Sequence, residues 1–452
     1  MNRTLAVKLG AIALLILLLM IPLLMIDGLV GERQQQRAQV LQDIARSSSY
    51  RQQLTGPILV LPYSKRLQEW KTHAQSGERY LEERQVRGRL YFLPERFELN
   101  GQVLTELRAR GIYQARLYRS DNQVSGLFKL PARFGLGDDL GAYRFDAPFL
   151  AVGISDIRGI SNALQLRLNG ASLAFAPGSG DERFGAGVHV PLPALDSQGG
   201  QSLAFAFDLK LQGTEQLSVV PVGRDSRVEL QSDWPHPSFV GEYLPSQRKV
   251  SAQGFSALWQ TSFFATNLEQ SLQDCVRKDS CQGLFGRSFG VSFVDPVDQY
   301  LKTERAIKYA LLFIALTFAV FFLFEVLKRL AVHPVQYALV GLSLALFYLL
   351  LLSLAEHLDF ALAYALAALA CVALNAFYVS HVLHSRLRGA AFGGLLAALY
   401  GLLYGLLSAE DYALLMGSLL VFGVLGGVMA LTRKLDWYGV GKAGADNPAS
   451  TR

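Results

Sequence analysis

The chain has 452 residues, of which 51% are hydrophobic and 18% charged, against roughly 25% charged residues in soluble proteins. Its mean hydropathy is +0.24, and the apolar residues concentrate at Leu9–Ile26 and from Ala306 to Leu431. This distribution excludes an ordinary cytosolic enzyme. The long segment between the two apolar regions, residues 27–305, excludes a purely polytopic transporter.

The net charge of +6 does not indicate a nucleic-acid-binding face. Residues 27–305 hold 32 Lys and Arg against 30 Asp and Glu, and the remainder holds 11 against 7. The excess of basic residues therefore flanks the apolar segments, where membrane topology accounts for it. Because a Walker loop is also missing, we expect neither nucleic acid nor nucleotide as a partner.

A membrane-spanning helix needs about 20 mainly apolar residues. The sequence predicts six such spans: Leu9–Ile26, Ala306–Leu327, Val335–Leu354, Phe360–Tyr378, Ala390–Leu407 and Tyr412–Leu431. Residues 1–27 have no small-x-small cleavage site, so we interpret them as an uncleaved signal anchor. The other five spans predict a helical bundle at 301–432. We expect the polar tail that follows, 433–452, to be disordered.

Lys and Arg in short connecting segments set the orientation of a membrane protein. The side of the N-terminus carries ten of them: Arg3, Lys8, Lys328, Arg329, Arg386, Arg388, Arg433, Lys434, Lys442 and Arg452. The two short loops of the other side, 355–359 and 409–411, hold four acidic residues and no basic one. We therefore expect both termini in the cytoplasm and residues 27–305 in the periplasm.

The periplasmic part begins with residues 28–55, whose apolar residues recur at helical spacing and predict an amphipathic helical stalk. Through 56–300 the period changes to two, as in Leu203–Leu211, and Asn169-Gly170 joins two alternating segments in a hairpin pattern. Phe97–Leu107 repeats that pattern around an Asn-Gly pair. The prediction is an α+β membrane protein: one N-terminal transmembrane helix, a large antiparallel β-rich domain of sandwich or roll type, and a C-terminal five-helix bundle.

The sequence offers little for catalysis. Gly286–Gly290 matches the G-x-S-x-G nucleophile elbow, which requires a strand-to-helix turn around its serine. Here the alternation in Phe289–Phe293 predicts that a strand follows Ser288 instead. Of the seven histidines, His381 and His384 could share a helix face, but no Cys or carboxylate joins them at metal-ligand spacing. We therefore expect no catalytic residue, no metal, no cofactor and no enzymatic activity.

Two candidate features lie in the predicted periplasmic domain. Cys275 and Cys281 are close in sequence, in a compartment where a disulfide persists; two unpaired thiols are the alternative. A Pro-flanked aromatic and histidine present rigid contact area at low entropic cost. The candidate partner surface therefore consists of Trp234, Pro235, His236, Pro237 and Phe239. The alternative is that this segment packs the β-domain onto the membrane bundle.

Two further features lie in the predicted spans. Glu325 is an intramembrane ionisable residue, and its spacing to Lys328 and Arg329 favours an ion pair; a proton or substrate relay is the alternative. Small residues at G-x-x-x-G spacing let helices approach closely, within the bundle or between copies in a homo-oligomer. Such pairs are Gly389/Gly393, Gly401/Gly405 and Gly423/Gly427.

Several long blocks carry a family resemblance. They are Ser232–Leu268, Asp298–Leu327 and His333–His357, together with GPILVLP (56–62), VHVPLP (188–193) and LSVVPVGR (217–224). The chain resembles the inner membrane protein CreD family over essentially its whole length. The resemblance implies a cell envelope integrity protein of the Gram-negative inner membrane, linked to envelope stress and the β-lactam response. No catalytic residues are established for that family, so none are carried over.

Together these features predict a non-enzymatic membrane protein whose β-domain binds an envelope protein or cell-wall component. The second hypothesis is a transporter or flippase that moves an envelope substrate through the five-helix bundle, with Glu325 and Asn375 in its path. A third, a periplasmic hydrolase, depends on Ser288.

Overall fold

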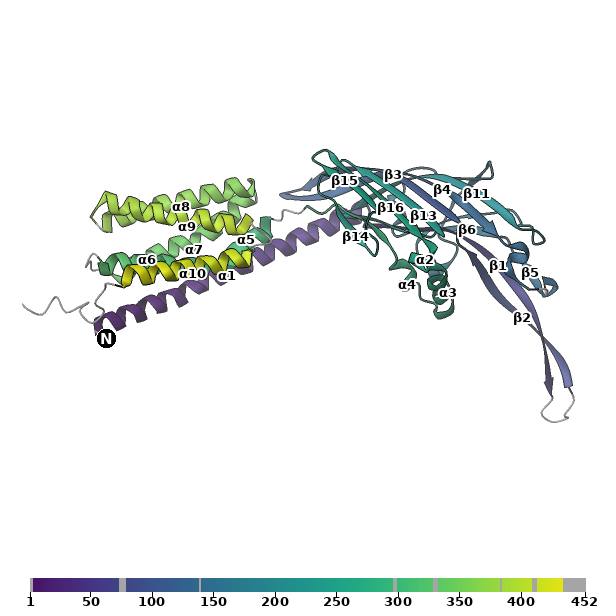
Figure 1. Ribbon diagram of the computed structural model, residues 1–452, viewed down its shortest axis with the longest axis horizontal. Coiled ribbons are helices and arrows are strands. Elements are labelled where there is room, and N and C mark those ends of the chain that lie inside the picture. The colour runs from purple at the N-terminus through teal and green to yellow at the C-terminus, as the bar shows by residue number, and fades with distance from the viewer. Residues whose placement is uncertain are drawn as a thin grey trace, which may run out of the picture. The chain divides into compact units, whose positions relative to one another are not determined.

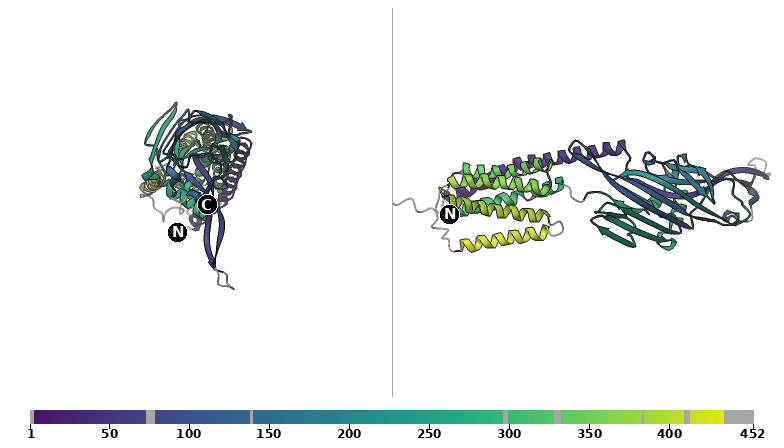
Figure 2. Two further views of the ribbon diagram at one scale, coloured as in Figure 1. Left: turned by 90° about the vertical axis from the view of Figure 1, so that its right-hand side faces the viewer. Right: turned by 90° about the horizontal axis from the view of Figure 1, so that it is seen from above.

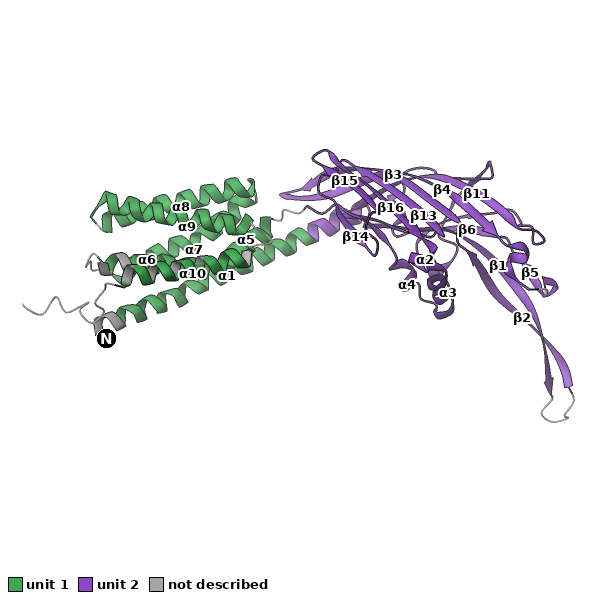
Figure 3. Ribbon diagram, viewed as in Figure 1, with its two compact units in different colours: residues 1–38, 297–452 green, residues 39–296 purple. Residues whose placement is uncertain are grey.

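The computed structural model describes residues 3–72, 79–137, 140–295, 299–327, 332–382, 384–408 and 413–433. The chain divides into two compact units, residues 1–38 with 297–452 (unit 1) and residues 39–296 (unit 2) (Figure 3). Lys328, Arg329 and all of the predicted disordered tail except Arg433 lie outside the described residues.

Helix α1 runs without interruption through Arg3–Ser47, so one helix covers the predicted anchor and most of the predicted stalk. Within unit 1, Arg33 of α1 forms an ion pair with Glu356 at 3.3 Å. Within unit 2, Ile44 near the end of α1 packs against buried Leu117. Each unit therefore holds its own portion of α1 through its own contacts.

The other helices of unit 1 run alongside one another (Figure 2). They are α5 Gln299–Lys308, α6 Ala310–Leu327, α7 Pro334–Ala355, α8 Phe360–Val382, α9 Arg386–Ser408 and α10 Ala413–Thr432. Among the described residues, α1, α7, α8 and α9 are long and apolar enough to cross a membrane, and α5 with α6 would make a fifth span if taken together. The apolar run of α10 in this part of the chain, Leu415–Gly427, is shorter.

The predicted continuous span Ala306–Leu327 is corrected by the structure. The helix breaks at Tyr309, and α5 and α6 meet at an angle of 45°. The physical reason lies in their composition, because α5 is amphipathic and carries the Glu304–Lys308 ion pair, whereas α6 is apolar except for Thr317 and Glu325.

Unit 2 consists of two sheets (Figure 1). One has the order β14-β17-β12-β1-β6-β10-β9, with β2 and β5 also paired to β1, and the other has the order β15-β16-β13-β3-β4-β11-β7-β8. The strands are β1 Gln52–Thr72, β2 Arg79–Phe92, β3 Arg96–Arg110, β4 Tyr113–Leu130, β5 Tyr143–Phe145, β6 Phe149–Ile154, β7 Gln165–Leu168, β8 Ala171–Ala174, β9 Ala176–Pro177, β10 Gly187–Pro191, β11 Gln201–Thr214, β12 Gln216–Val220, β13 Asp225–Ser232, β14 Ser238–Gly241, β15 Gln247–Ser251, β16 Gly254–Ser262 and β17 Phe289–Ser292. Short helices α2 Phe263–Thr266, α3 Leu268–Lys278 and α4 Gln282–Phe285 precede β17.

One hydrophobic core is shared by the two sheets. Leu59 and Val60 come from one sheet and Phe97, Phe128 and Phe207 from the other, and all five are almost fully buried. Two packed sheets around a common core form the predicted sandwich-like layer architecture. The prediction of a wholly antiparallel domain is corrected, because β1 pairs with β12 and β3 with β13 in parallel. Long connections join these strands, and such connections permit either direction of pairing.

The two Asn-Gly pairs behave differently. Asn169 and Gly170 both have positive φ and connect β7 to β8, which confirms the predicted hairpin. The second predicted hairpin is wrong, because β3 continues through Gly101, which pairs with strands on both sides. A Cβ at Gly101 would lie 2.7 Å from the side chains of Asn122 and Leu230, so glycine permits close packing there rather than a turn.

Candidate functional site

Trp234–Pro237 lie in the turn between β13 and β14, Phe239 lies in β14, and the indole ring of Trp234 is buried. Trp234 Nε1 donates to the carbonyl oxygen of His236 at 2.7 Å, and the Arg116 guanidinium lies over the indole, 3.9 Å from the ring centroid. The other predicted surface residues are half-buried except for the exposed histidine: Pro235, Pro237, Phe239 and His236. Trp234 therefore packs inside unit 2, and His236 is the exposed member of the set.

We expect Trp234→Ala to destabilise unit 2 by about 3 kcal/mol, because it removes a buried indole. We expect His236→Ala to change stability by less than about 0.5 kcal/mol, because that side chain is exposed. Urea unfolding of the full chain in detergent, followed by the fluorescence of buried Trp259, measures both. Equal midpoints for the two variants would contradict this assignment.

The structure joins Cys275 and Cys281 in a disulfide. Cys275 lies in α3 and Cys281 precedes α4, so the bond closes the turn that holds Asp279. The Asp279 carboxylate lies 3.0 Å from Nε of Arg183. The disulfide thus braces a segment that contacts the groove described below.

Glu325 is buried in unit 1, and its partners come from three segments. Lys8 of α1 forms an ion pair with it, Tyr337 of α7 donates its hydroxyl to Oε2 at 2.8 Å, and the backbone N–H of Val332 donates to Oε1 at 3.0 Å. The sequence spacing pointed to residues 328 and 329, outside the described part of the chain. Lys8 is 317 positions away, so no local pattern could identify it.

Asn375 of α8 belongs to a second polar cluster in unit 1. Its Nδ2 donates to Ser343 Oγ at 2.8 Å and to the carbonyl oxygen of Cys371 at 2.9 Å. The Tyr400 hydroxyl donates to the Cys371 sulfur at 3.1 Å. These groups satisfy one another across α7, α8 and α9, as polar residues do when they hold membrane helices together.

The G-x-x-x-G pairs differ in their surroundings. A Cβ at Gly389 would lie 2.5 Å from Cβ of Ser380, and one at Gly393 would lie 2.8 Å from Cβ of Ala376, so this pair lets α8 and α9 approach closely. Around Gly401, Gly423 and Gly427 no described atom lies within 4 Å of such a Cβ. The first pair therefore packs within the bundle.

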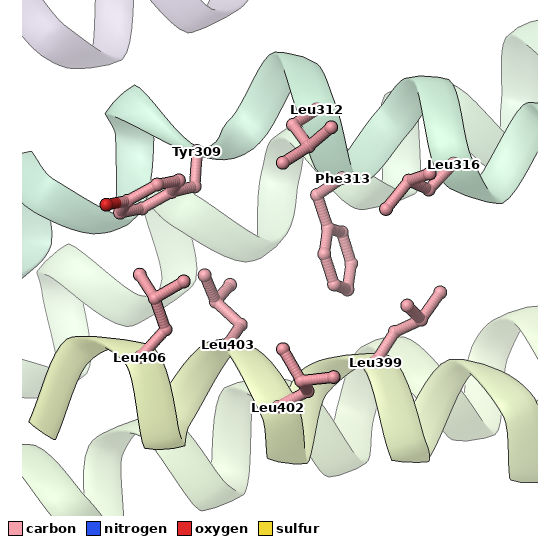
Figure 4. Close-up of a pocket in the computed structure, with 8 residues that line it drawn as sticks. All are labelled: Tyr309, Leu312, Phe313, Leu316, Leu399, Leu402, Leu403 and Leu406. Carbon is pink, nitrogen blue, oxygen red and sulfur yellow. The ribbon is translucent and has the colours of Figure 1, made fainter. Parts of the chain in front are cut away.

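A small crevice lies between α6 and α9 (Figure 4). Its volume of about 20 Å³ is close to that of one water molecule. Its lining is leucine and aromatic: Tyr309, Leu312, Phe313, Leu316, Leu399, Leu402, Leu403 and Leu406. A space of this size offers a polar substrate no room, and the hydroxyl of Tyr309 is the one polar side-chain group among these lining residues.

A large groove of unit 2 lies at the base of the long two-stranded ribbon that β1 and β2 form (the ribbon is seen in Figure 1). It has a volume of about 1230 Å³, and its lining includes Asp181, whose side chain is 1% exposed. Arg89 Nη1 lies 2.7 Å from Asp181 Oδ2, Tyr91 donates its hydroxyl to the same oxygen at 2.6 Å, and Arg183 Nη1 lies 3.3 Å from Oδ1. Arg183 also donates to the Tyr91 oxygen at 2.9 Å. A buried carboxylate thus orients two arginines and a tyrosine along one wall of the groove.

The electrostatics of this cluster follow from the geometry. Burial by itself raises the pKa of the Asp181 carboxyl, but hydrogen bonds from Tyr91 and Arg89 outweigh burial and hold the pKa below its usual range. Burial and the hydrogen bond to Asp181 raise the pKa of the Tyr91 hydroxyl to about 12. At neutral pH the carboxylate is therefore ionised and the tyrosine is a neutral donor.

Sequence reasoning missed this groove. The available signal was the segment Gly178–Gly185, in which charged residues stand between glycines, three of which have positive φ. Such a loop brings polar side chains and backbone close to a ligand. Its partners on β2 lie about ninety positions earlier, so the sequence did not indicate that the two segments meet.

The chain has apolar helices long enough to cross a bilayer both before and after a β-rich unit in the sequence. This order defines an integral membrane protein with a large folded domain outside the bilayer. The family model described as Inner membrane protein CreD matches residues 4–438. The chain is also 39% identical, over 423 residues, to the Inner membrane protein CreD of Escherichia coli (strain K12), which covers 94% of this chain and 91% of that protein. The chain belongs to the CreD family and is an inner-membrane protein of the cell envelope, as the resemblance predicted.

Proposed function

We propose that the protein contributes to envelope integrity under stress as a non-enzymatic binding protein. Unit 1 anchors it in the bilayer, both termini are cytoplasmic, and unit 2 lies in the periplasm and holds an envelope protein or cell-wall component. The observation that carries this proposal is the polar groove around Asp181, because its arginines and tyrosine are oriented before any ligand arrives.

The surroundings of Ser288 support a role other than hydrolysis. Helix α4 ends at Phe285, and β17 begins at Phe289. This order of helix, serine and strand is the reverse of the strand, serine and helix of a nucleophile elbow.

Dye uptake tests the function. Cells lacking the protein are expected to take up a normally excluded dye faster than the parent strain under detergent or β-lactam stress, and the intact chain is expected to restore exclusion. The double variant Arg87→Ala/Arg89→Ala, present at the normal level, is expected not to restore it. Uptake that is the same in the deletion and parent strains would overturn the proposal.

A transporter or flippase is the second candidate, favoured by the polar cluster of Ser343 and Asn375 inside the bundle. The double variant Ser343→Ala/Asn375→Leu separates the two functions. If it abolishes dye exclusion at a normal protein level while the groove variant retains exclusion, transport is the better account.

Thiol labelling tests the proposed orientation. A cysteine replacing exposed Gln253, between β15 and β16, is expected to react with a membrane-impermeant maleimide in cells with a permeabilised outer membrane. The matched variant His384→Cys, between α8 and α9, is expected to react only after lysis. The opposite labelling pattern would reverse the topology.

A further inference from the structure

The groove around Asp181 offers both donors and acceptors of hydrogen bonds. Residues two apart on a strand share a face, so β2 presents Arg87, Arg89 and Tyr91 together. The strand therefore supplies donors, to which Arg183 adds another, and the carboxylates of Glu182 and Asp279 line the groove as acceptors. Arg87 is exposed and has no hydrogen bond or ion pair among the described residues, so its donors are available to a ligand.

The lining and size of the groove restrict the ligand. Of the sixteen described residues that line it, Pro62 and Val276 have aliphatic side chains, Tyr63 and Tyr91 are aromatic, and the other twelve are charged residues, serine or glycine. This predominantly polar lining suits an acyl chain or an apolar peptide anchor poorly. Its volume of about 1230 Å³ exceeds the about 300–1000 Å³ typical of small-molecule sites. A linear polymer rich in hydroxyl and amide groups meets both conditions.

We infer that this groove binds a segment of a glycan strand. Hydroxyl and acetamido groups both donate and accept hydrogen bonds, which matches the mixture of arginine, tyrosine and carboxylate side chains. The inference rests on the proposed function and names the chemical class of its ligand.

The groove is held in shape before binding. The Ser179 hydroxyl lies 2.7 Å from the carbonyl oxygens of Asp181 and Gly185 and closes the loop on itself. On the other side, the Cys275–Cys281 disulfide closes the turn of Asp279, which contacts Arg183. The side chains that Asp181 holds therefore lose little entropy when a ligand binds, which favours binding of a flexible polymer.

Calorimetric titration of the full chain in detergent with a tetrasaccharide of alternating N-acetylglucosamine and N-acetylmuramic acid tests the inference. Saturable binding is expected, weakened at least about tenfold by Arg87→Ala, which removes charge-assisted hydrogen bonds. The matched control is Arg84→Ala, an exposed arginine of the same strand that does not line the groove; its affinity is expected to stay within about twofold of the parent. Urea unfolding checks that both variants fold.

The inference is overturned by the absence of a heat of binding at about 1 mM tetrasaccharide, or by equal affinity for the parent and Arg87→Ala. A photo-cross-linker at position 87 that captures an envelope protein in place of glycan would also overturn it. The proposed function is judged separately, because faster dye uptake in deleted cells does not depend on the ligand's class.

Discussion

Asp181→Ala is expected to destabilise unit 2 by about 3 kcal/mol. This value lies near the lower end of the free-energy range for removing one partner of a buried ion pair. The variant removes a carboxylate that is 1% exposed, while Arg89 and Arg183, 37% and 28% exposed, keep some contact with water. Urea unfolding of the full chain followed by tryptophan fluorescence measures this. Three of the four tryptophans, Trp70, Trp234 and Trp259, lie in unit 2.

The matched control is Asp208→Ala, which removes an exposed carboxylate 3.6 Å from Arg167. It is expected to change stability by less than about 0.5 kcal/mol. An unfolding midpoint for Asp181→Ala equal to that of the parent would contradict the role assigned to the buried carboxylate.

The same carboxylate gives unit 2 a defined response to acid. Because the pKa of Asp181 is lower in the folded protein than in the unfolded chain, its contribution is fully present above the unfolded pKa of about 3.9. That contribution is lost as the pH falls through the lower, folded pKa. The stability difference between the parent and Asp181→Asn is therefore expected to shrink below about pH 4.

Lys8→Met is expected to destabilise unit 1 by about 3 kcal/mol, because it leaves the carboxylate of Glu325 buried without its cation. Glu325→Leu is expected to cost less, since the Lys8 ammonium is 26% exposed and can reach the bilayer surface. The double variant Lys8→Met/Glu325→Leu is expected to be more stable than Lys8→Met, because neither charge remains. SDS-induced loss of helical circular dichroism measures all three.

The matched control for Lys8 is Lys308→Met, which removes an exposed lysine paired with Glu304 on the same helix. It is expected to cost less than about 0.5 kcal/mol. If stability changes in the single variants simply add in the double variant, the Lys8–Glu325 pair does not stabilise the bundle.

Sequence alone determined the features that depend on neighbouring residues. Apolar runs of membrane length predicted where α7, α8 and α9 lie, alternation predicted β11, and Asn169-Gly170 predicted a turn. Each of these predictions succeeded because backbone periodicity and turn geometry are set within a few residues. The short separation of Cys275 and Cys281 in the sequence favoured a disulfide over two unpaired thiols, and the structure joins the two residues.

Tertiary structure alone decided which distant segments meet. Gly101 has the local pattern of a hairpin, yet strands from both sides pair through it and keep β3 straight. Lys8 reaches Glu325 across 317 positions. Asp181 finds its arginine and tyrosine on a strand about ninety positions away. An ion pair or a groove is specified by the distance between side chains in space, and local periodicity carries no information about that distance when the partners lie on different elements.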